Sequence, residues 1–121
     1  MNKRLIEWIV KYVESRDAFT KTLLSTEVKE DHILFTFKDK KQLYLVEPDL
    51  QEVVFEKIAE DQHVVIVTLN SKENLGFLVQ CWKRFLIKNL SLFFVDLEFN
   101  TRWIVSPYTH NSIADEESLE S

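Results

Sequence analysis

Apolar residues recur three and four positions apart in two parts of the chain, with charged residues between them. That spacing is typical of one face of an amphipathic helix. It predicts helices over residues 3–15 and 72–88. Asp49 and Asn70 each precede a glutamate by three residues, which is the spacing of a capping box at a helix start. We therefore expect a further short, acidic helix over residues 50–60, and Asn70 should begin the helix that follows it.

Segments rich in β-branched and aromatic residues predict six strands. These strands cover residues 19–29, 32–38, 43–46, 64–69, 90–97 and 102–105. The segment 64–69 is a continuous apolar run without polar alternation, which is typical of a strand covered on both faces. The order of elements is α-β-β-β-α-β-α-β-β, in which helix-linked strands can lie parallel in one sheet. The sequence therefore predicts an α/β domain of three layers, a mixed sheet flanked by helices.

The chain is long enough for one domain and too short for two. Its 121 residues are 45% apolar and 29% charged, as in ordinary globular proteins. We therefore expect a single globular domain over residues 1–110. Residues 111–121 are acidic and poor in apolar groups, so they predict a flexible tail. The sequence leaves open whether this end is the natural terminus or the cut edge of a longer protein.

Composition excludes several classes of function. Gly76 is the single glycine, so the chain has neither a Walker loop nor a Rossmann fingerprint. The net charge is -5, from 20 acidic and 15 basic residues, which argues against a broad grip on nucleic acid. Cys81 is the single cysteine, which excludes an intramolecular disulfide, and no apolar run has the length of a signal peptide or membrane span. We expect a cytoplasmic protein that does not enter membranes.

Metal and cofactor chemistry has no clear signal in the sequence. The histidines lack the close spacing of zinc sites, and no metal site or cofactor is predicted. His32 and His63 each precede an apolar run and are interpreted as polar residues at strand starts. Cys81 lies inside a predicted helix, where a thiolate gains no help from the helix dipole, so it is interpreted as a packing residue. Whether the chain is an enzyme is left open.

Acidic residues gather around the second and third predicted strands. They are Asp31, Asp39, Glu47 and Asp49. The element order α-β-β-β-α-β, over roughly the first 70 residues, is similar to the core of the restriction-endonuclease-like nucleases. In that family an Asp and an Asp/Glu-x-Lys group hold Mg²⁺ and polarise an attacking water. The resemblance implies that these four carboxylates are candidate catalytic ligands.

The family motif itself is displaced in this chain. Asp39-Lys40-Lys41 falls on a predicted turn rather than on the third strand, and Glu47 is followed by Pro48 and Asp49 with no lysine. A metal-dependent nuclease-like domain, active or degenerate, is therefore the alternative hypothesis for the function.

The region around the last predicted strand has the composition of a binding surface. Arg102 and Trp103 are typical interface residues at a predicted sheet edge, and Tyr108 and His110 lie in a short polar segment after it. Turn formation at Pro107 and packing of the Tyr108 ring are the simpler interpretation of that segment. The first hypothesis is nevertheless a non-enzymatic protein-binding or assembly module, whose partner is another protein or a second copy of the chain rather than a nucleic acid.

Overall fold

The structure is a computed structural model that describes residues 3–58 and 62–110. The strands are β1 (Leu23–Val28), β2 (His32–Phe37), β3 (Lys41–Val46), β4 (His63–Leu69), β5 (Leu90–Asp96) and β6 (Thr101–Val105). The helices are α1 (Lys3–Asp17), α2 (Val54–Lys57), α3 (Lys72–Gln80) and the 3-10 helix η1 (Trp82–Phe85). Residues 107–110 add a helical turn. The predicted class, a mixed sheet combined with helices, is confirmed, and the tail predicted over 111–121 lies outside the described residues.

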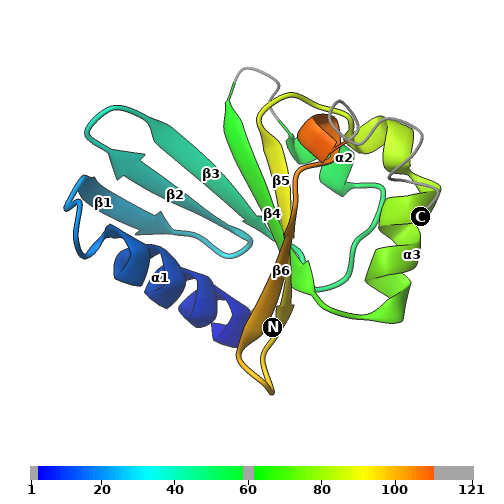
Figure 1. Ribbon diagram of the computed structural model, residues 1–121, viewed down its shortest axis with the longest axis horizontal. Coiled ribbons are helices and arrows are strands. Elements are labelled where there is room, and N and C mark those ends of the chain that lie inside the picture. The colour runs from blue at the N-terminus through cyan, green and yellow to red at the C-terminus, as the bar shows by residue number, and fades with distance from the viewer. Residues whose placement is uncertain (1–2, 59–61, 111–121) are drawn as a thin grey trace.

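The six strands lie in the order β1-β2-β3-β4-β5-β6 (Figure 1). The strands β1, β2 and β3 form an antiparallel meander, whereas β3, β4 and β5 run parallel and β6 returns antiparallel to β5. The carboxyl ends of the three parallel strands therefore meet at one edge of the sheet. The start of β2 lies at the same edge, because β2 is antiparallel to β3.

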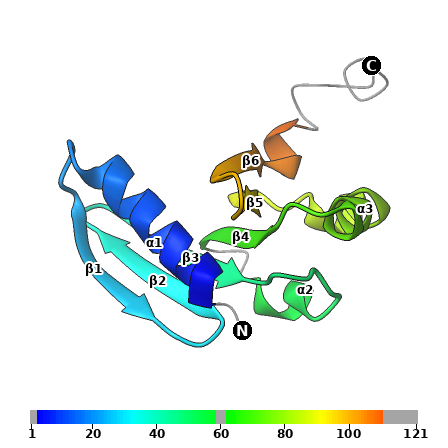
Figure 2. The same ribbon diagram turned by 90° about the horizontal axis from the view of Figure 1, so that it is seen from below.

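Helices lie on both faces of the central strands of the sheet (Figure 2). The helix α1 packs on one face and buries Leu5, Ile9 and Val13 there. The other face is covered by α2, α3 and η1. Residues of β4 alternate between the two cores, with Val65 and Val67 facing α1 and Val64 and Ile66 facing the other side. This is why the strand reads as an unbroken apolar run. Among the described residues, no helix has the length and apolar character needed to cross a membrane.

The first predicted strand, over residues 19–29, is too long. Only Leu23–Val28 forms β1. The carboxylate of Asp17 accepts hydrogen bonds from the backbone N–H groups of Thr22 and Leu23, each at 2.9 Å. These local bonds hold the chain in a turn after α1, because they occupy donors that a longer strand would use in the ladder.

The helix predicted over residues 50–60 is also wrong in extent, since α2 has only four residues. The expected capping box at Asp49 does not begin it. Instead the backbone N–H of Leu50 donates to Oδ1 of Asn74, at 2.8 Å. The segment after β3 is thus bound to a neighbouring helix and cannot start a helix of its own at Asp49.

The single helix predicted over residues 72–88 is divided into α3 and η1. The division falls at Cys81, whose φ of -106° and ψ of 23° depart from helical geometry. The backbone N–H groups of Arg84 and Phe85 both donate to the carbonyl of Cys81. This tighter winding places Phe85, which is fully buried, in the core beneath α3. Packing of one large aromatic side chain therefore overrides the helical periodicity.

Asn74 is one of two buried polar residues in the described chain, and it connects three segments. Its side chain accepts from Leu50 and donates to the carbonyls of Pro48 and Leu69, each at 2.8 Å. The hydroxyl of buried Thr68 donates to the same Pro48 carbonyl, at 3.1 Å. Because buried polar groups are costly unless paired, these bonds fix the loop after β3 against α3 and β4.

Asn74→Ala should lower the free energy of unfolding by about 2 to 3 kcal/mol, because it leaves buried backbone groups without partners. Urea unfolding measures this difference. Asn70→Ala is the matched control, because Asn70 is exposed and does not cap α3 as the sequence predicts: the N-cap is Ser71, whose side chain accepts from the backbone N–H of Asn74. The effect of Asn70→Ala should stay within about 0.5 kcal/mol. Equal effects of the two substitutions would contradict the role assigned to Asn74.

Candidate functional site

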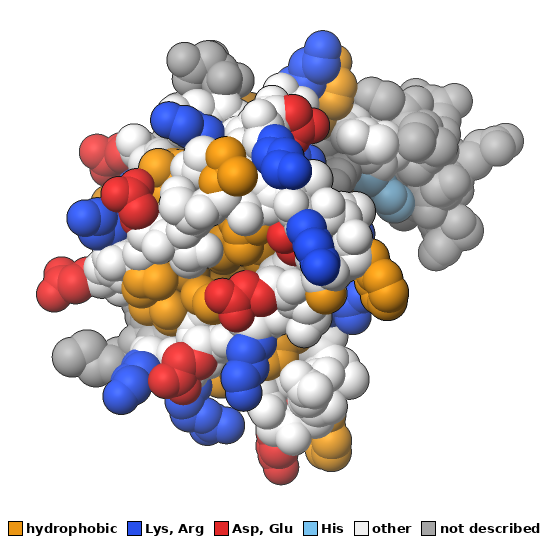
Figure 3. Space-filling model, turned by 90° about the vertical axis from the view of Figure 1, so that its left-hand side faces the viewer, with side chains coloured by type: hydrophobic (Ala, Val, Ile, Leu, Met, Phe, Trp, Pro, Cys, Tyr) orange, Lys and Arg blue, Asp and Glu red, His pale blue; other side chains and the backbone are white. Residues whose placement is uncertain are grey.

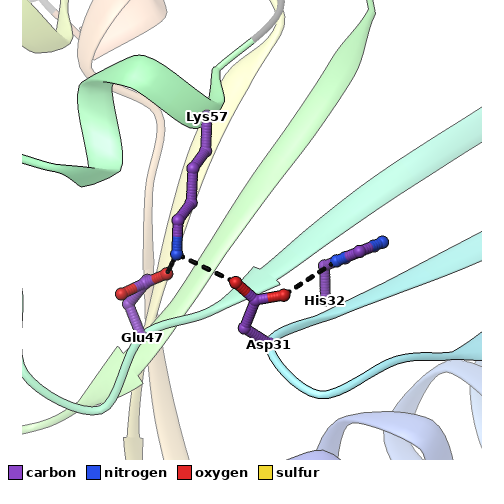
Figure 4. Close-up of polar contacts among 4 residues, drawn as sticks. All are labelled: Asp31, His32, Glu47 and Lys57. Atoms are coloured by element: carbon purple, nitrogen blue, oxygen red, sulfur yellow. Dashed lines mark hydrogen bonds and ion pairs between the residues drawn. The ribbon is translucent and has the colours of Figure 1, made fainter.

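Two of the four acidic candidates converge on one lysine at the carboxyl edge of the parallel strands (Figure 4). The ammonium of Lys57, at the end of α2, lies 2.6 Å from Oε2 of Glu47 and 3.0 Å from Oδ2 of Asp31. The second oxygen of Asp31 is 2.9 Å from Nδ1 of His32. These four residues, Asp31, His32, Glu47 and Lys57, are called the edge cluster below.

The backbone fixes the two carboxylates relative to each other. The N–H of Val46 donates to the carbonyl of Asp31 at 2.8 Å, which extends the β2–β3 pairing to the residue before β2. The N–H of Glu47 donates to the carbonyl of Val67 at 2.8 Å, which extends the β3–β4 pairing by one residue. Both acids thus lie one residue outside a strand, and backbone hydrogen bonds hold that residue to the sheet. A site built in this way keeps its geometry better than one carried by loops.

The edge cluster is partly open to solvent. The side chain of Glu47 is 12% exposed, Lys57 is 31% exposed and Asp31 is 45% exposed. Asp31 and the Lys57 ammonium are therefore accessible from solvent, whereas Glu47 is nearly buried beside them. Two carboxylates share one ammonium here, so the combined charge of Asp31, Glu47 and Lys57 is negative.

The contacts within the edge cluster shift two pKa values. The hydrogen bond from His32, and then that from Lys57, lowers the pKa of Asp31. The hydrogen bonds to Glu47 and then Asp31 raise the pKa of Lys57. The two shifts agree, because each charged form stabilises the other. Asp31 therefore stays ionised and Lys57 stays protonated at neutral pH.

Asp31 and Glu47 are close enough to share one cation, here the ammonium of Lys57. Carboxylate oxygens are the preferred protein ligands of Mg²⁺. The described residues contain no group of three or more His, Cys, Asp or Glu side chains placed to hold a metal ion by themselves. Mg²⁺, however, is commonly bound by one or two carboxylates, with water and substrate phosphate as the other ligands. Asp31 and Glu47 provide two such carboxylates, and the Lys57 ammonium lies in contact with both of them.

The other two acidic candidates lie elsewhere. Asp39 is in the turn between β2 and β3, at the opposite end of both strands from Asp31 and Glu47. Asp49 is exposed in the loop after β3, two residues beyond Glu47. The structure thus brings Asp31 and Glu47 together and leaves Asp39 at the other end of the β2–β3 hairpin.

The candidate binding residues are divided between two faces of β6. Trp103 and His110 line an apolar hollow of about 440 Å³ between α3 and β6, together with Trp82. The guanidinium of Arg102 lies instead on the α1 side, 4.7 Å from the centre of the Tyr12 ring. Tyr108 is 44% exposed and lies outside the lining of that hollow.

Sequence reasoning missed Lys57 and the contact of His32. The family motif places a lysine two residues after an acid on a strand, whereas Lys57 follows Glu47 by ten residues and lies on a separate helix. Lys57 reaches the two acids only because α2 folds over the carboxyl end of β3. His32 was interpreted as a strand-start residue, which its position in β2 agrees with, but its ring also contacts Asp31.

Comparisons of the chain with protein-family models, with curated proteins and with solved structures find no significant match. The chemistry of the edge cluster and the arrangement of the strands therefore carry the functional argument.

Lys57→Met should raise the pKa of Asp31, which NMR titration of its carboxyl group measures directly. Because the pKa of Asp31 is lower in the folded chain, its contacts stabilise the fold above the unfolded-state pKa and lose that effect as the pH falls through the folded-state pKa. The difference in stability between the native protein and the variant should therefore shrink below about pH 4. Lys83→Met, which removes an exposed lysine of η1, should leave Asp31 unmoved. An unchanged Asp31 midpoint in Lys57→Met would contradict the assigned contacts.

Proposed function

We propose that the edge cluster is a Mg²⁺-dependent site for phosphodiester hydrolysis, in a three-layer domain of the restriction-endonuclease-like type. The observation that carries the proposal is the convergence of Asp31, Glu47 and Lys57 at the ends of β2, β3 and α2. An acid before the second strand, an acid at the third strand and a nearby lysine are what the resemblance requires. In the family motif the lysine stands two residues after the second acid, and Asp49 occupies that position in this chain. The lysine of the edge cluster, Lys57, comes from α2 instead. Because of this convergence, we place the nuclease-like hypothesis before that of a protein-binding or assembly module, which the sequence favours.

The residues of the edge cluster would have separate tasks. Asp31 and Glu47 would hold the metal ion, which supplies Lewis-acid activation of water and neutralises charge on the phosphate. The water oxygen would attack phosphorus and give up a proton to solvent, the bond from phosphorus to the leaving oxygen would break, and the leaving oxygen would take a proton from solvent. Lys57 would shift from the carboxylates toward the scissile phosphate, where its ammonium stabilises the negative charge that develops.

The acidic character of the chain limits how a nucleic acid would bind. A net charge of -5 opposes a long basic track, so the proposed substrate contacts are limited to the few phosphates next to the edge cluster. Binding of the substrate should therefore be weak and its affinity should fall as salt rises. Lys57 and the metal ion supply the local positive charge.

Removal of any one of the three central groups should abolish the activity. Asp31→Asn, Glu47→Gln and Lys57→Met should each lower the rate of Mn²⁺- or Mg²⁺-dependent cleavage of short DNA and RNA by at least about 100-fold. Asp39→Asn is the matched control, because Asp39 lies at the far end of the hairpin, and it should keep the native rate. If the native chain shows no divalent-dependent cleavage of any of these substrates, or if Asp31→Asn cleaves as fast as Asp39→Asn, the proposal fails.

Assembly through β6 is the second candidate, and the contrast between the two sheet edges favours it. The β1 edge has a register shift between Leu23 and Ser25, and charged side chains of both signs surround its apolar patches (Figure 3). Bulges and charges protect an edge strand from pairing. Both edges expose large apolar side chains, Leu24 (62%) and Val28 (51%) in β1 and Trp103 (51%) and Ile104 (40%) in β6. The β6 edge differs in that it pairs with β5 in continuous register.

A second copy of the chain suits the β6 edge. Antiparallel pairing of two β6 strands centred on Trp103 would place Arg102 of each copy beside Ile104 of the other, so no like charges would face each other. Each Trp103 would then lie beside the apolar hollow between α3 and β6, to which exposed Val79 also contributes. This pairing would extend the sheet across the two copies.

Ile104→Lys should weaken such a dimer by at least about tenfold in dissociation constant, because it places a charge in the paired edge. Light scattering across a concentration series measures this change. Leu24→Lys makes the same type of substitution at an exposed position of β1 and should leave the dimer intact. A strictly monomeric native protein at all concentrations would exclude assembly through β6.

A further inference from the structure

A second hollow lies at the other end of the β2–β3 hairpin from the edge cluster. It has a volume of about 300 Å³ and lies between the C-terminal end of α1 and the strands β2 and β3. This volume is at the lower end of the range for small-molecule pockets. Lys40, in the turn of the hairpin, and Arg16, in the last turn of α1, both contribute to its lining. The hollow is therefore separate from the proposed catalytic site.

Aromatic rings form part of the walls and hold the two cations in place. The guanidinium of Arg16 lies 5.7 Å from the centre of the Tyr12 ring, and the ammonium of Lys40 lies 5.5 Å from that of Phe37. Both rings line the hollow. Cation–π contacts of this kind attract a cation to a ring face without neutralising its charge. Both positive charges thus remain available to a ligand.

The carboxylate of Asp17, which also lines the hollow, is already engaged. Oδ1 accepts from the backbone N–H of Thr22 (2.9 Å), the Thr22 hydroxyl (2.8 Å) and the Thr20 hydroxyl (3.1 Å). Oδ2 accepts from the backbone N–H of Leu23, at 2.9 Å. These four bonds tie the acid to the turn after α1, and no ion pair joins it to Arg16 or Lys40 among the described residues.

The polar groups that remain are mainly hydrogen-bond donors. The hydroxyl of Tyr12 accepts from Arg16 at 3.0 Å, which leaves its own proton to donate. The hydroxyl of Tyr44 donates to the side-chain carbonyl of Gln42 at 3.4 Å, which leaves the Gln42 amide group as a donor. Burial raises the pKa of Tyr44 to about 12, so this hydroxyl keeps its proton. Two cations and these donors make the lining complementary to an anion.

We propose that this hollow binds a small organic phosphate of mononucleotide size, with its phosphate between Arg16 and Lys40 and its planar body against the Phe37 ring. The Tyr12 ring is covered by Trp8, stacked at 5.3 Å, and by the guanidinium of Arg102 at 4.7 Å, so Tyr12 contributes its hydroxyl rather than its ring face. A phosphate monoester carries close to two negative charges at neutral pH, whereas the two cations and the Asp17 carboxylate give the lining a net positive charge. Arginine presents a planar fork suited to phosphate oxygens. Aromatic side chains provide stacking surfaces for a base. The proposal does not depend on the edge cluster having activity.

Calorimetric titration of the full chain tests this assignment, with adenosine monophosphate as the probe and without divalent ions, so that the edge cluster contributes nothing. The expected dissociation constant is about 0.1 to 1 mM. Inorganic phosphate and adenosine alone should each bind more weakly, because each uses only part of the lining. Equal affinity for inorganic phosphate and for the nucleotide would overturn the role of the aromatic walls.

Substitution of either cation should weaken binding by roughly tenfold. Lys40→Gln is the cleaner variant, because Lys40 is exposed in a turn, and Arg16→Gln is the second. Lys41→Gln is the matched control, since Lys41 is the adjacent exposed lysine and is not part of the lining. The assignment is overturned if the nucleotide does not bind, or if Lys40→Gln and Lys41→Gln bind it equally well.

Discussion

The buried amide of Asn74 holds the loop after β3, and the position of the edge cluster depends on that loop. The parallel strands β3, β4 and β5 all end at this edge, where backbone groups no longer have ladder partners. Asn74 and Thr68 supply those partners to Pro48 and Leu50. Because Glu47 directly precedes this segment, the same bonds that satisfy the buried backbone also orient the acid. Stability and site geometry thus share one set of interactions.

The edge cluster places one positive charge between two negative ones at a half-open surface. Such a pair contributes little to stability when water screens it, typically below about 1 kcal/mol. A stability role alone therefore gives a weak reason to bring Asp31, Glu47 and Lys57 together from three elements. The proposed metal site gives a further reason, because a cation that replaced Lys57 between the carboxylates would free the ammonium to meet a phosphate.

Much of the fold follows from local patterns in the sequence, whereas the site does not. The apolar run of β4 predicts a covered central strand, and the stripe of α1 predicts its packing, because burial decides both. The lengths of α2 and α3 could not be predicted, since the contact of Leu50 with Asn74 and the burial of Phe85 are tertiary. Asp31 and Glu47 were found from their places beside strands. Lys57 could not be predicted as a site residue, because nothing in the adjacent sequence indicates that α2 folds back over β3.

Mn²⁺ binding followed by paramagnetic broadening in two-dimensional NMR spectra gives the most direct test of the edge cluster as a metal site. At low Mn²⁺ concentration, the amide signals of Asp31, His32 and Glu47 should broaden first, and those around Asp39 should stay sharp. Asp31→Asn should remove this localised broadening. If broadening is absent, or if it centres on another group of acids while the edge cluster is unaffected, then Asp31 and Glu47 do not form a metal site and the proposed hydrolysis is wrong.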